Sequence, residues 1–195
     1  MVVAALLALS LAQIDMAPQL QRGPLVLVEE GKGGKFGQAT AIVLIDAPPE
    51  KVWDMLVKMD DQKSWMPKVL TSDITRKGPK DFDIHFVLDV PGPDTDYVIR
   101  YTPDAKNRSL DGSWMSGDLK GSHWYWRVEE APGGKTLLYH SISVKNFSAF
   151  AQSFEDDAQT ITVGLNVSSV LTGAKGLKKH CEAPPAPAAT ATSGK

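Results

Sequence analysis

Cysteine is almost absent from this chain, and several classes of protein are excluded as a result. Cys181 is the one cysteine among 195 residues, so neither an internal disulfide framework nor a cysteine-based zinc cluster can form. The four histidines are scattered, and none belongs to an H-E-x-x-H or H-x-H pair. We therefore expect no metal site and no cofactor.

An excess of charge of either sign is missing too. Lys and Arg number 21 and Asp and Glu number 23, for a net charge of −2. Nucleic-acid partners normally require a clustered basic surface, so none is expected. The one dense basic cluster, Lys175, Lys178 and Lys179, lies where a helix is expected to end, and there it complements the negative end of the helix dipole.

Familiar catalytic motifs are not found. The segment GSWMSG over residues 112–117 does not fit the G-x-S-x-G pattern of a nucleophile elbow. Residues 134–136, GKT, imitate the end of a phosphate-binding loop, but Glu129 stands where its first glycine belongs. An enzyme would therefore have to depend on residues brought together by the fold.

Apolar runs long enough to span a bilayer are missing, but a short one opens the chain. Residues 2–12, VVAALLALSLA, close on Ser10, Leu11 and Ala12, a small-x-small pattern typical of a signal peptide cleaved before Gln13. No basic residue precedes the run, so a start site further upstream or a plain apolar helix remain alternatives. We expect export to the periplasm or the outside of the cell; the alternative is a cytoplasmic protein.

The two flanks of the central region have the composition of connecting segments. Residues 13–24 are expected to form a linker. Residues 183–195, APPAPAATATSGK, contain no large apolar side chain, so burial cannot offset the entropy of ordering them, and we expect a disordered tail. The apolar content of 43 % is sufficient for one domain with a real core over residues 25–182.

What is present is a clear junction between a strand and a helix at residues 46–53, DAPPEKVW. The apolar run over residues 41–45 predicts a strand, and Pro48 and Pro49 suit the first turn of a helix over residues 49–60. Val52, Trp53 and Leu56 recur at helical spacing. A second short helix or turn is expected before Pro67, within the segment Trp65-Met66-Pro67.

Strand patterns dominate the middle of the chain. Residues 25–45 are typical of a hairpin, and residues 69–144 alternate between apolar and polar positions, with turn signals every eight to fifteen residues. Alternation places one face of an antiparallel sheet in solvent and the other against a cover. The covered face collects the aromatic rings of Phe82, Phe86, Tyr97, Tyr101, Trp114, Trp124 and Trp126.

The cover is expected to be a long helix over residues 147–179. It carries two apolar stripes on roughly opposite sides: Phe154, Ala158, Ile161 and Leu165 form one, and Val163, Val167, Val170, Ala174 and Leu177 form the other. Interspersed polar residues argue against a membrane span. Gly164 inside it has two interpretations: either a kink or tight packing at this point, or room for a ligand.

The order of these elements, with DAPPEKVW at the first junction and Trp65-Met66-Pro67 closing the helical pair, resembles the START-like superfamily. That group includes polyketide cyclases and dehydrases, coenzyme-Q-binding proteins, lipid-transfer domains and proteins like the birch-pollen allergen. The resemblance covers about residues 25–182. It implies an α+β helix-grip fold, in which a curved antiparallel sheet of about seven strands surrounds a long C-terminal helix, with two short helices after the first strands.

Family resemblance alone cannot decide between activities on this scaffold. The leading hypothesis is non-catalytic binding or transport of a hydrophobic small molecule, such as a lipid, sterol, quinone or polyketide, by a monomer with transient membrane contact. The residues expected to line its cavity are Phe82, Phe86, Tyr97, Tyr101, Trp114, Trp124, Trp126, His140, Ile161 and Leu165.

Two other hypotheses remain. His140 lies on the apolar face of its strand, so a cyclase or dehydratase could use it together with Tyr101. A lone histidine on such a face is more often a hydrogen-bonded core group. The third reading is an interaction module whose concave face is simply filled by side chains, and a cavity too small for a ligand of about 300 Å³ would favour it.

Overall fold

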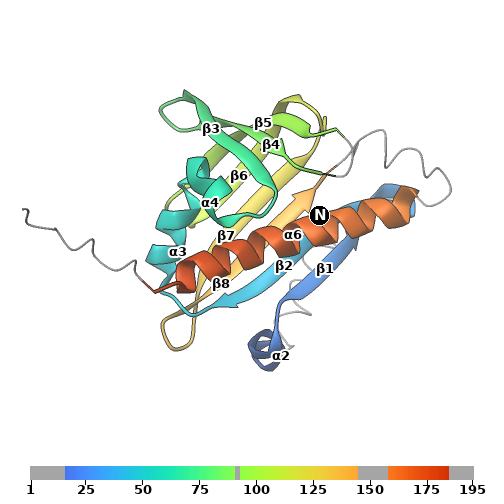
Figure 1. Ribbon diagram of the computed structural model, residues 1–195. Coiled ribbons are helices and arrows are strands. Elements are labelled where there is room, and N and C mark those ends of the chain that lie inside the picture. Colours follow the sequence, from blue (N-terminus) through green and yellow to red (C-terminus); the bar gives the residue numbers. More distant parts are fainter. Residues whose placement is uncertain (1–15, 91–92, 145–157, 185–195) are drawn as a thin grey trace, which may run out of the picture.

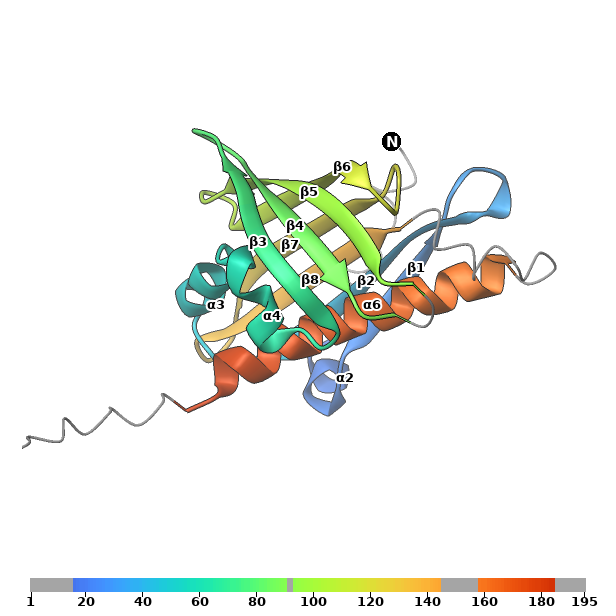
Figure 2. The same ribbon diagram turned by 45° about the horizontal axis from the view of Figure 1, so that its top comes forward.

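The computed structural model describes residues 16–90, 93–144 and 158–184. Eight antiparallel strands form one strongly curved sheet, and a long helix lies along its concave side (Figures 1 and 2). The strands are β1 (Leu25–Glu30), β2 (Phe36–Ile45), β3 (Val69–Lys77), β4 (Phe82–Leu88), β5 (Thr95–Asp104), β6 (Ser109–Gly117), β7 (His123–Ala131) and β8 (Lys135–Ser143). The helices are α2 (Ala17–Arg22), α3 (Pro49–Leu56), α4 (Gln62–Trp65) and α6 (Ala158–Glu182), and short 3₁₀ turns are η1 (Lys32–Gly34) and η2 (Met59–Asp61).

The order of strands across the sheet is β1-β2-β8-β7-β6-β5-β4-β3. After the β1–β2 hairpin the chain leaves the sheet through α3 and α4 and re-enters at the opposite edge as β3. It then returns strand by strand until β8 pairs with β2. The predicted helix-grip fold is confirmed, with eight strands where about seven were expected.

The junction after β2 has the predicted form. Pro48 is the N-cap residue of α3 and Pro49 its first helical residue. Val52 and Leu56 are fully buried, while Trp53 is half-buried and packs against the core. The backbone N–H of Asp46 donates to a carboxylate oxygen of Glu182 at 2.7 Å, so the junction is fastened to the end of α6.

Helix α6 buries the second of its two predicted stripes. Val170, Ala174 and Leu177 are fully buried, and Cys181 continues the stripe with no exposed surface. The other stripe faces outward, since Leu165 is 38 % exposed. Where α6 passes the end of β8, the buried side chain of Asn166 accepts from the backbone N–H of Val144 at 2.9 Å and donates to its carbonyl at 3.2 Å.

The ends of the described region differ in part from expectation. The predicted linker contains α2, whose Leu20 is buried; six residues with a proline show too little periodicity to reveal a helix. Cys181, close to the predicted tail, lies in the last turn of α6 and is fully buried. The predicted signal peptide, Phe154 and most of the predicted tail lie outside the described residues. Within the described ranges, no helix combines the length and the hydropathy needed to cross a membrane.

The convex face of the sheet carries the charged residues, as alternation predicted. Asp83 lies between two guanidinium groups: its carboxylate accepts from Arg76 Nε at 2.9 Å and from Arg100 Nε at 2.8 Å. These hydrogen bonds, that of Arg100 above all, lower the pKa of Asp83 to about 2. His85 and His123 also face outward and pair with Asp96 and Asp111, each at 2.9 Å.

Candidate functional site

A small cavity lies between the concave face of the sheet and α6. Its volume is about 60 Å³. The wall is built mainly from the inward positions of β4, β5, β7 and β8, and it is completed by Met66 after α4, Leu119 before β7 and Ser169 on α6. Strand alternation is the reason that these side chains converge, because every second residue of a curved sheet points to its concave side.

Six of the ten residues predicted to line a cavity are brought together there. They are Phe86, Tyr97, Tyr101, Trp124, Trp126 and His140. All six are buried. Their convergence follows from register, since Phe86 pairs with Tyr97 across β4 and β5, and Trp126 pairs with His140 across β7 and β8.

Four predicted lining residues lie elsewhere. Phe82 is half-buried against Tyr101, with ring centroids 5.8 Å apart, and borders a separate hollow beside the β3–β4 turn. Trp114 is half-buried and its indole N–H donates to the carbonyl of Asp118 at 2.8 Å. Ile161 and Leu165 belong to the outward stripe of α6. The two stripes of α6 are similarly apolar, so the sequence could not show which of them faces the sheet.

The lining residues missed by sequence reasoning had weak signals. Met66 follows the short helix α4, and its position next to Trp65 in the quoted segment was the one available pointer. Leu119 stands in a turn and adopts a positive φ of 63°, a backbone conformation that an apolar residue rarely takes. Gln62 and Ser169 are polar residues whose inward orientation depends on packing between helix and sheet.

Aromatic rings pack against one another over much of the cavity wall. Tyr97 and Trp124 are stacked with centroids 5.6 Å apart and an angle of 3° between their planes. Phe86 packs at 5.6 Å against Tyr97 and edge-on at 6.5 Å against Tyr101. Offset and edge-to-face contacts of this kind add about 0.5–1.5 kcal/mol each beyond burial of area.

His140 is stacked directly on Trp126, with centroids 3.4 Å apart and planes 7° from parallel. Its Nδ1 lies 3.2 Å from the carbonyl oxygen of Val170 on α6, so Nδ1 carries the proton and Nε2 is left as an acceptor. The close approach of helix and ring depends on Gly173. A β-carbon there would lie 2.8 Å from His140 Cε1 and 3.2 Å from Trp126 Cη2.

Burial keeps the ionisable groups of the cavity neutral. It lowers the pKa of His140 to about 3, so the imidazole is uncharged at physiological pH. It also raises the pKa of Tyr97 above its ordinary value and that of Tyr101 well above 10, so both phenols stay protonated. The wall therefore offers hydrogen bonds rather than a base poised to take a proton near pH 7.

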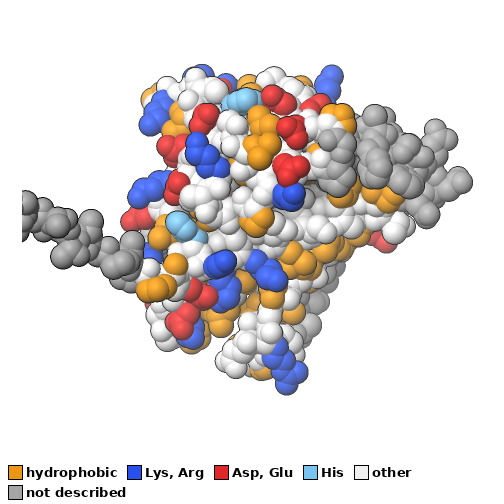
Figure 3. Space-filling model, viewed as in Figure 1, with side chains coloured by type: hydrophobic (Ala, Val, Ile, Leu, Met, Phe, Trp, Pro, Cys, Tyr) orange, Lys and Arg blue, Asp and Glu red, His pale blue; other side chains and the backbone are white. Residues whose placement is uncertain are grey.

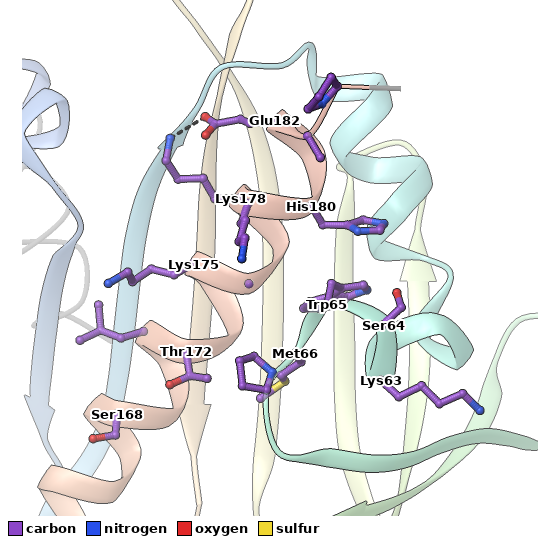
Figure 4. Close-up of a pocket in the computed structure, with 16 residues that line it drawn as sticks. Lys63, Ser64, Trp65, Met66, Ser168, Thr172, Lys175, Lys178, His180 and Glu182 are labelled. Atoms are coloured by element: carbon purple, nitrogen blue, oxygen red, sulfur yellow. Dashed lines mark hydrogen bonds and ion pairs between the residues drawn. The ribbon is translucent and has the colours of Figure 1, made fainter. Parts of the chain in front are cut away.

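A second concave region lies on the outer side of α6 (Figure 4). It is an open groove of about 1280 Å³ that runs along the outward face of α6 to α4. Figure 4 shows Lys175 and Lys178 on the side of α6 away from α4, and Trp65 and Lys63 on the α4 side. Met66 lines both this groove and the interior cavity, so it forms part of the wall between them.

The groove is basic, and only some of its lysines form hydrogen bonds or ion pairs near the C-terminal end of α6. Lys178 donates to Glu182 at 2.5 Å and to the carbonyl of Leu44 at 2.6 Å. The carbonyl of Cys181 accepts from Lys51 Nζ at 2.7 Å, so a lysine of α3 satisfies one of the free carbonyls at the C-terminal end of α6. Lys175 and Lys179 are exposed and form no ion pair with another described residue. Across the described ranges, no cluster of three potential metal ligands occurs.

The curved sheet, the long helix on its concave side and the apolar cavity between them define a START-like helix-grip protein. The sequence profile of the family described as polyketide cyclase/dehydrase and lipid transport matches residues 37–182. The chain belongs to this family, which confirms the resemblance seen in the sequence. Among curated proteins, none matches the sequence.

Solved structures of several proteins share the fold. A protein from Thermus thermophilus is 16 % identical, with a TM-score of 0.67 over 74 % of this chain and 97 % of that one. The Zhui aromatase/cyclase from Streptomyces sp. R1128 is 15 % identical, with a TM-score of 0.64 over 75 % and 93 %. A STAR-related lipid transfer protein from Xanthomonas axonopodis is 13 % identical, with a TM-score of 0.64 over 83 % and 94 %. At these identities the likeness establishes the fold, which lipid-transfer proteins and cyclases share.

Proposed function

We propose that this protein binds a hydrophobic small molecule, such as a lipid, sterol, quinone or polyketide, between the sheet and α6 without transforming it. The observation that carries the proposal is the cavity wall of stacked aromatic rings with a few neutral polar groups. Cavities of this composition hold apolar ligands and orient them by a small number of hydrogen bonds. Membership of a family that includes lipid-transport proteins supports the same function.

The size of the cavity sets a condition on this function. A volume of about 60 Å³ is far below the ~300 Å³ at the lower end of ligand pockets, and by itself it favours the reading of a filled concave face. Binding of a lipid-sized molecule therefore requires side chains to move. Met66 is suited to this because its unbranched, flexible side chain stands between the cavity and the open groove.

Native mass spectrometry of the purified protein, followed by titration with fluorescent fatty acids, sterols and quinones, tests binding directly. Two neighbouring serines of α6 provide a matched pair of variants. Ser169 lines the cavity and Ser168 is exposed on the outward face. Ser169→Phe should abolish uptake by filling the cavity, while Ser168→Phe should leave it intact. Ligand-free protein that takes up none of the probes would refute the proposal.

A cyclase or dehydratase remains the second candidate because His140 and Tyr101 both line the cavity. The low pKa of His140 makes it a weak base near neutral pH, which favours holding over proton abstraction. If the protein is an enzyme, His140→Ala abolishes turnover of a candidate polyketide while its affinity stays nearly unchanged. Equal loss of affinity and turnover would assign His140 a packing role.

We further propose that the protein is exported, acts as a monomer and touches membranes transiently. The apolar run over residues 2–12 supports export, and N-terminal sequencing of the secreted or periplasmic form tests it. Lysine side chains over the C-terminal half of α6, and hydrophobic ones along its N-terminal half, support contact with anionic lipid (Figure 3).

The membrane contact has a simple test. Lys175→Glu with Lys179→Glu should abolish co-flotation with vesicles that contain phosphatidylglycerol, and Lys80→Glu with Lys106→Glu, the same charge change elsewhere, should not. Equal flotation of both double variants would contradict the proposal. Light scattering during size-exclusion chromatography checks that the protein is a monomer.

A further inference from the structure

One buried donor in the cavity wall has no acceptor. Among the described residues, Trp126 Nε1 is the one fully buried side-chain nitrogen or oxygen without a hydrogen-bond partner. A buried donor without a partner destabilises the folded state, because it loses its hydrogen bond to water and gains none in the protein. Such groups are rare in folded proteins, and each one calls for an explanation in terms of strain, a bound water or a ligand.

The indole ring is held so that it cannot turn to find a partner in the protein. His140 covers one of its faces at 3.4 Å, and Trp65 meets it edge-on at 6.3 Å with an angle of 84°. Gly173 of α6 presses on its rim, where even an added methyl group would lie 3.2 Å from Cη2. The Nε1–H donor therefore has a fixed position beside the cavity, and a ligand atom reaches it only when neighbouring side chains move, as binding in a cavity of this size requires.

The neighbouring polar groups favour a neutral acceptor. The Tyr101 hydroxyl interacts with the Trp126 side chain without completing a hydrogen bond to Nε1, and burial keeps this phenol protonated and able to donate. No lysine or arginine lines the described cavity, and His140 is uncharged. A carboxylate or phosphate would be desolvated here without a counter-charge, at a cost of several kcal/mol.

We propose that Trp126 Nε1–H, with the Tyr101 hydroxyl beside it, anchors a carbonyl oxygen of the bound molecule. This deepens the proposed function and rests on it: the ligand class narrows to neutral hydrophobic compounds with a ketone, quinone or ester carbonyl. A carbonyl oxygen has two lone pairs and accepts from both donors at once. An anionic head, where a ligand has one, stays outside the cavity.

The test uses two probes that differ in one group. Acetophenone and ethylbenzene have nearly the same size, but a carbonyl in the first replaces a methylene in the second. The chain has five tryptophans, so its ¹H–¹⁵N spectrum shows five indole signals, which Trp→Phe variants assign. Acetophenone should move the Trp126 indole proton downfield, as hydrogen bonding does, and ethylbenzene should not.

Affinities provide the second readout. Trp126→Phe keeps an aromatic ring and removes the donor. It should therefore lower the affinity for acetophenone about fivefold to tenfold more than the affinity for ethylbenzene, which is the equivalent of one hydrogen bond. Trp124→Phe is the matched control, since Trp124 lines the same cavity and its indole nitrogen is not an unpaired buried donor. It should change both affinities by similar factors.

The outcomes separate this inference from the proposed function. Equal weakening of both probes by Trp126→Phe, or an indole signal that acetophenone does not move, overturns the carbonyl anchor while binding itself stands. An indole proton already shifted downfield without any probe shows that the donor has an acceptor, a bound water or the Tyr101 hydroxyl, and also overturns it. Failure of both probes to bind also overturns the anchor, and the proposed function is refuted only if the fatty acids, sterols and quinones fail to bind as well. The spectra of the unmodified chain decide the matter even if Trp126→Phe does not fold.

Discussion

Gly173→Ala should destabilise the protein, although alanine is the better helix former. The added β-carbon would lie 2.8 Å from His140 Cε1 and 3.0 Å from its Nδ1, well inside the 3.4 Å at which ordinary contacts begin. The ring has little room to retreat, because Trp126 is stacked on one of its faces with the ring centroids 3.4 Å apart. Overpacking of this kind costs about 1–3 kcal/mol.

Gly164→Ala is the matched control on the same helix. No other described atom lies within 4 Å of a β-carbon at Gly164, so tight packing does not explain this glycine. Alanine there should stabilise α6 by about 0.5–1 kcal/mol through helix propensity. Both variants share this gain in helix propensity. The difference between their free energies of unfolding therefore measures the clash at His140 alone, which should be about 1–3 kcal/mol.

Urea denaturation followed by tryptophan fluorescence measures both free energies of unfolding, provided that the m-values agree with the unmodified chain. Ligand uptake is the second readout, since Gly173→Ala also displaces His140 from the cavity wall and Gly164→Ala does not. Equal stabilities of the two variants would refute the account of α6 packed against the His140–Trp126 stack.

Two other predictions concern the charged convex face and the attachment of α6. Asp83→Asn should destabilise the protein at neutral pH, and the difference from the unmodified chain should shrink as pH falls. The carboxylate has a folded-state pKa of about 2 against an ordinary 3.8, so its contribution is complete above about pH 4 and is lost between pH 4 and pH 2. Urea denaturation across this range checks it, and a constant difference would contradict the role of the charge. Asn166→Ala should cost about 2 kcal/mol, because the backbone N–H and carbonyl of Val144 lose their partner in a buried site. Hydrogen exchange should show faster exchange of the Val144 amide, and an unchanged rate would argue against the attachment.

Most of the fold could be predicted from local patterns. The β2–α3 junction was visible because Pro48 and Pro49 constrain only their own backbone and that of the residues before them. The buried parity of Tyr97, Ile99 and Tyr101 was visible because side chains alternate along any strand. Six cavity-lining residues followed from that alternation alone.

The rest of the site could not be predicted because it depends on contacts between distant segments. Leu165 was expected in the cavity and is exposed, since its stripe and that of Val170 have similar apolar character. Leu119 lines the cavity from a turn that shows no periodic pattern. The small volume of the cavity is the sum of many side-chain contacts across the sheet and has no sequence signature.

Spacing along the chain specifies the elements, the faces of the strands, the family and the absence of local metal and catalytic motifs. Packing between distant segments sets which side of α6 faces the sheet, how little space is left beneath it, and that Trp126 keeps an unpaired donor there. The close approach of Gly173 to His140 brings residues 33 positions apart into contact. Close packing of such distant parts decides these features, and no local pattern encodes it.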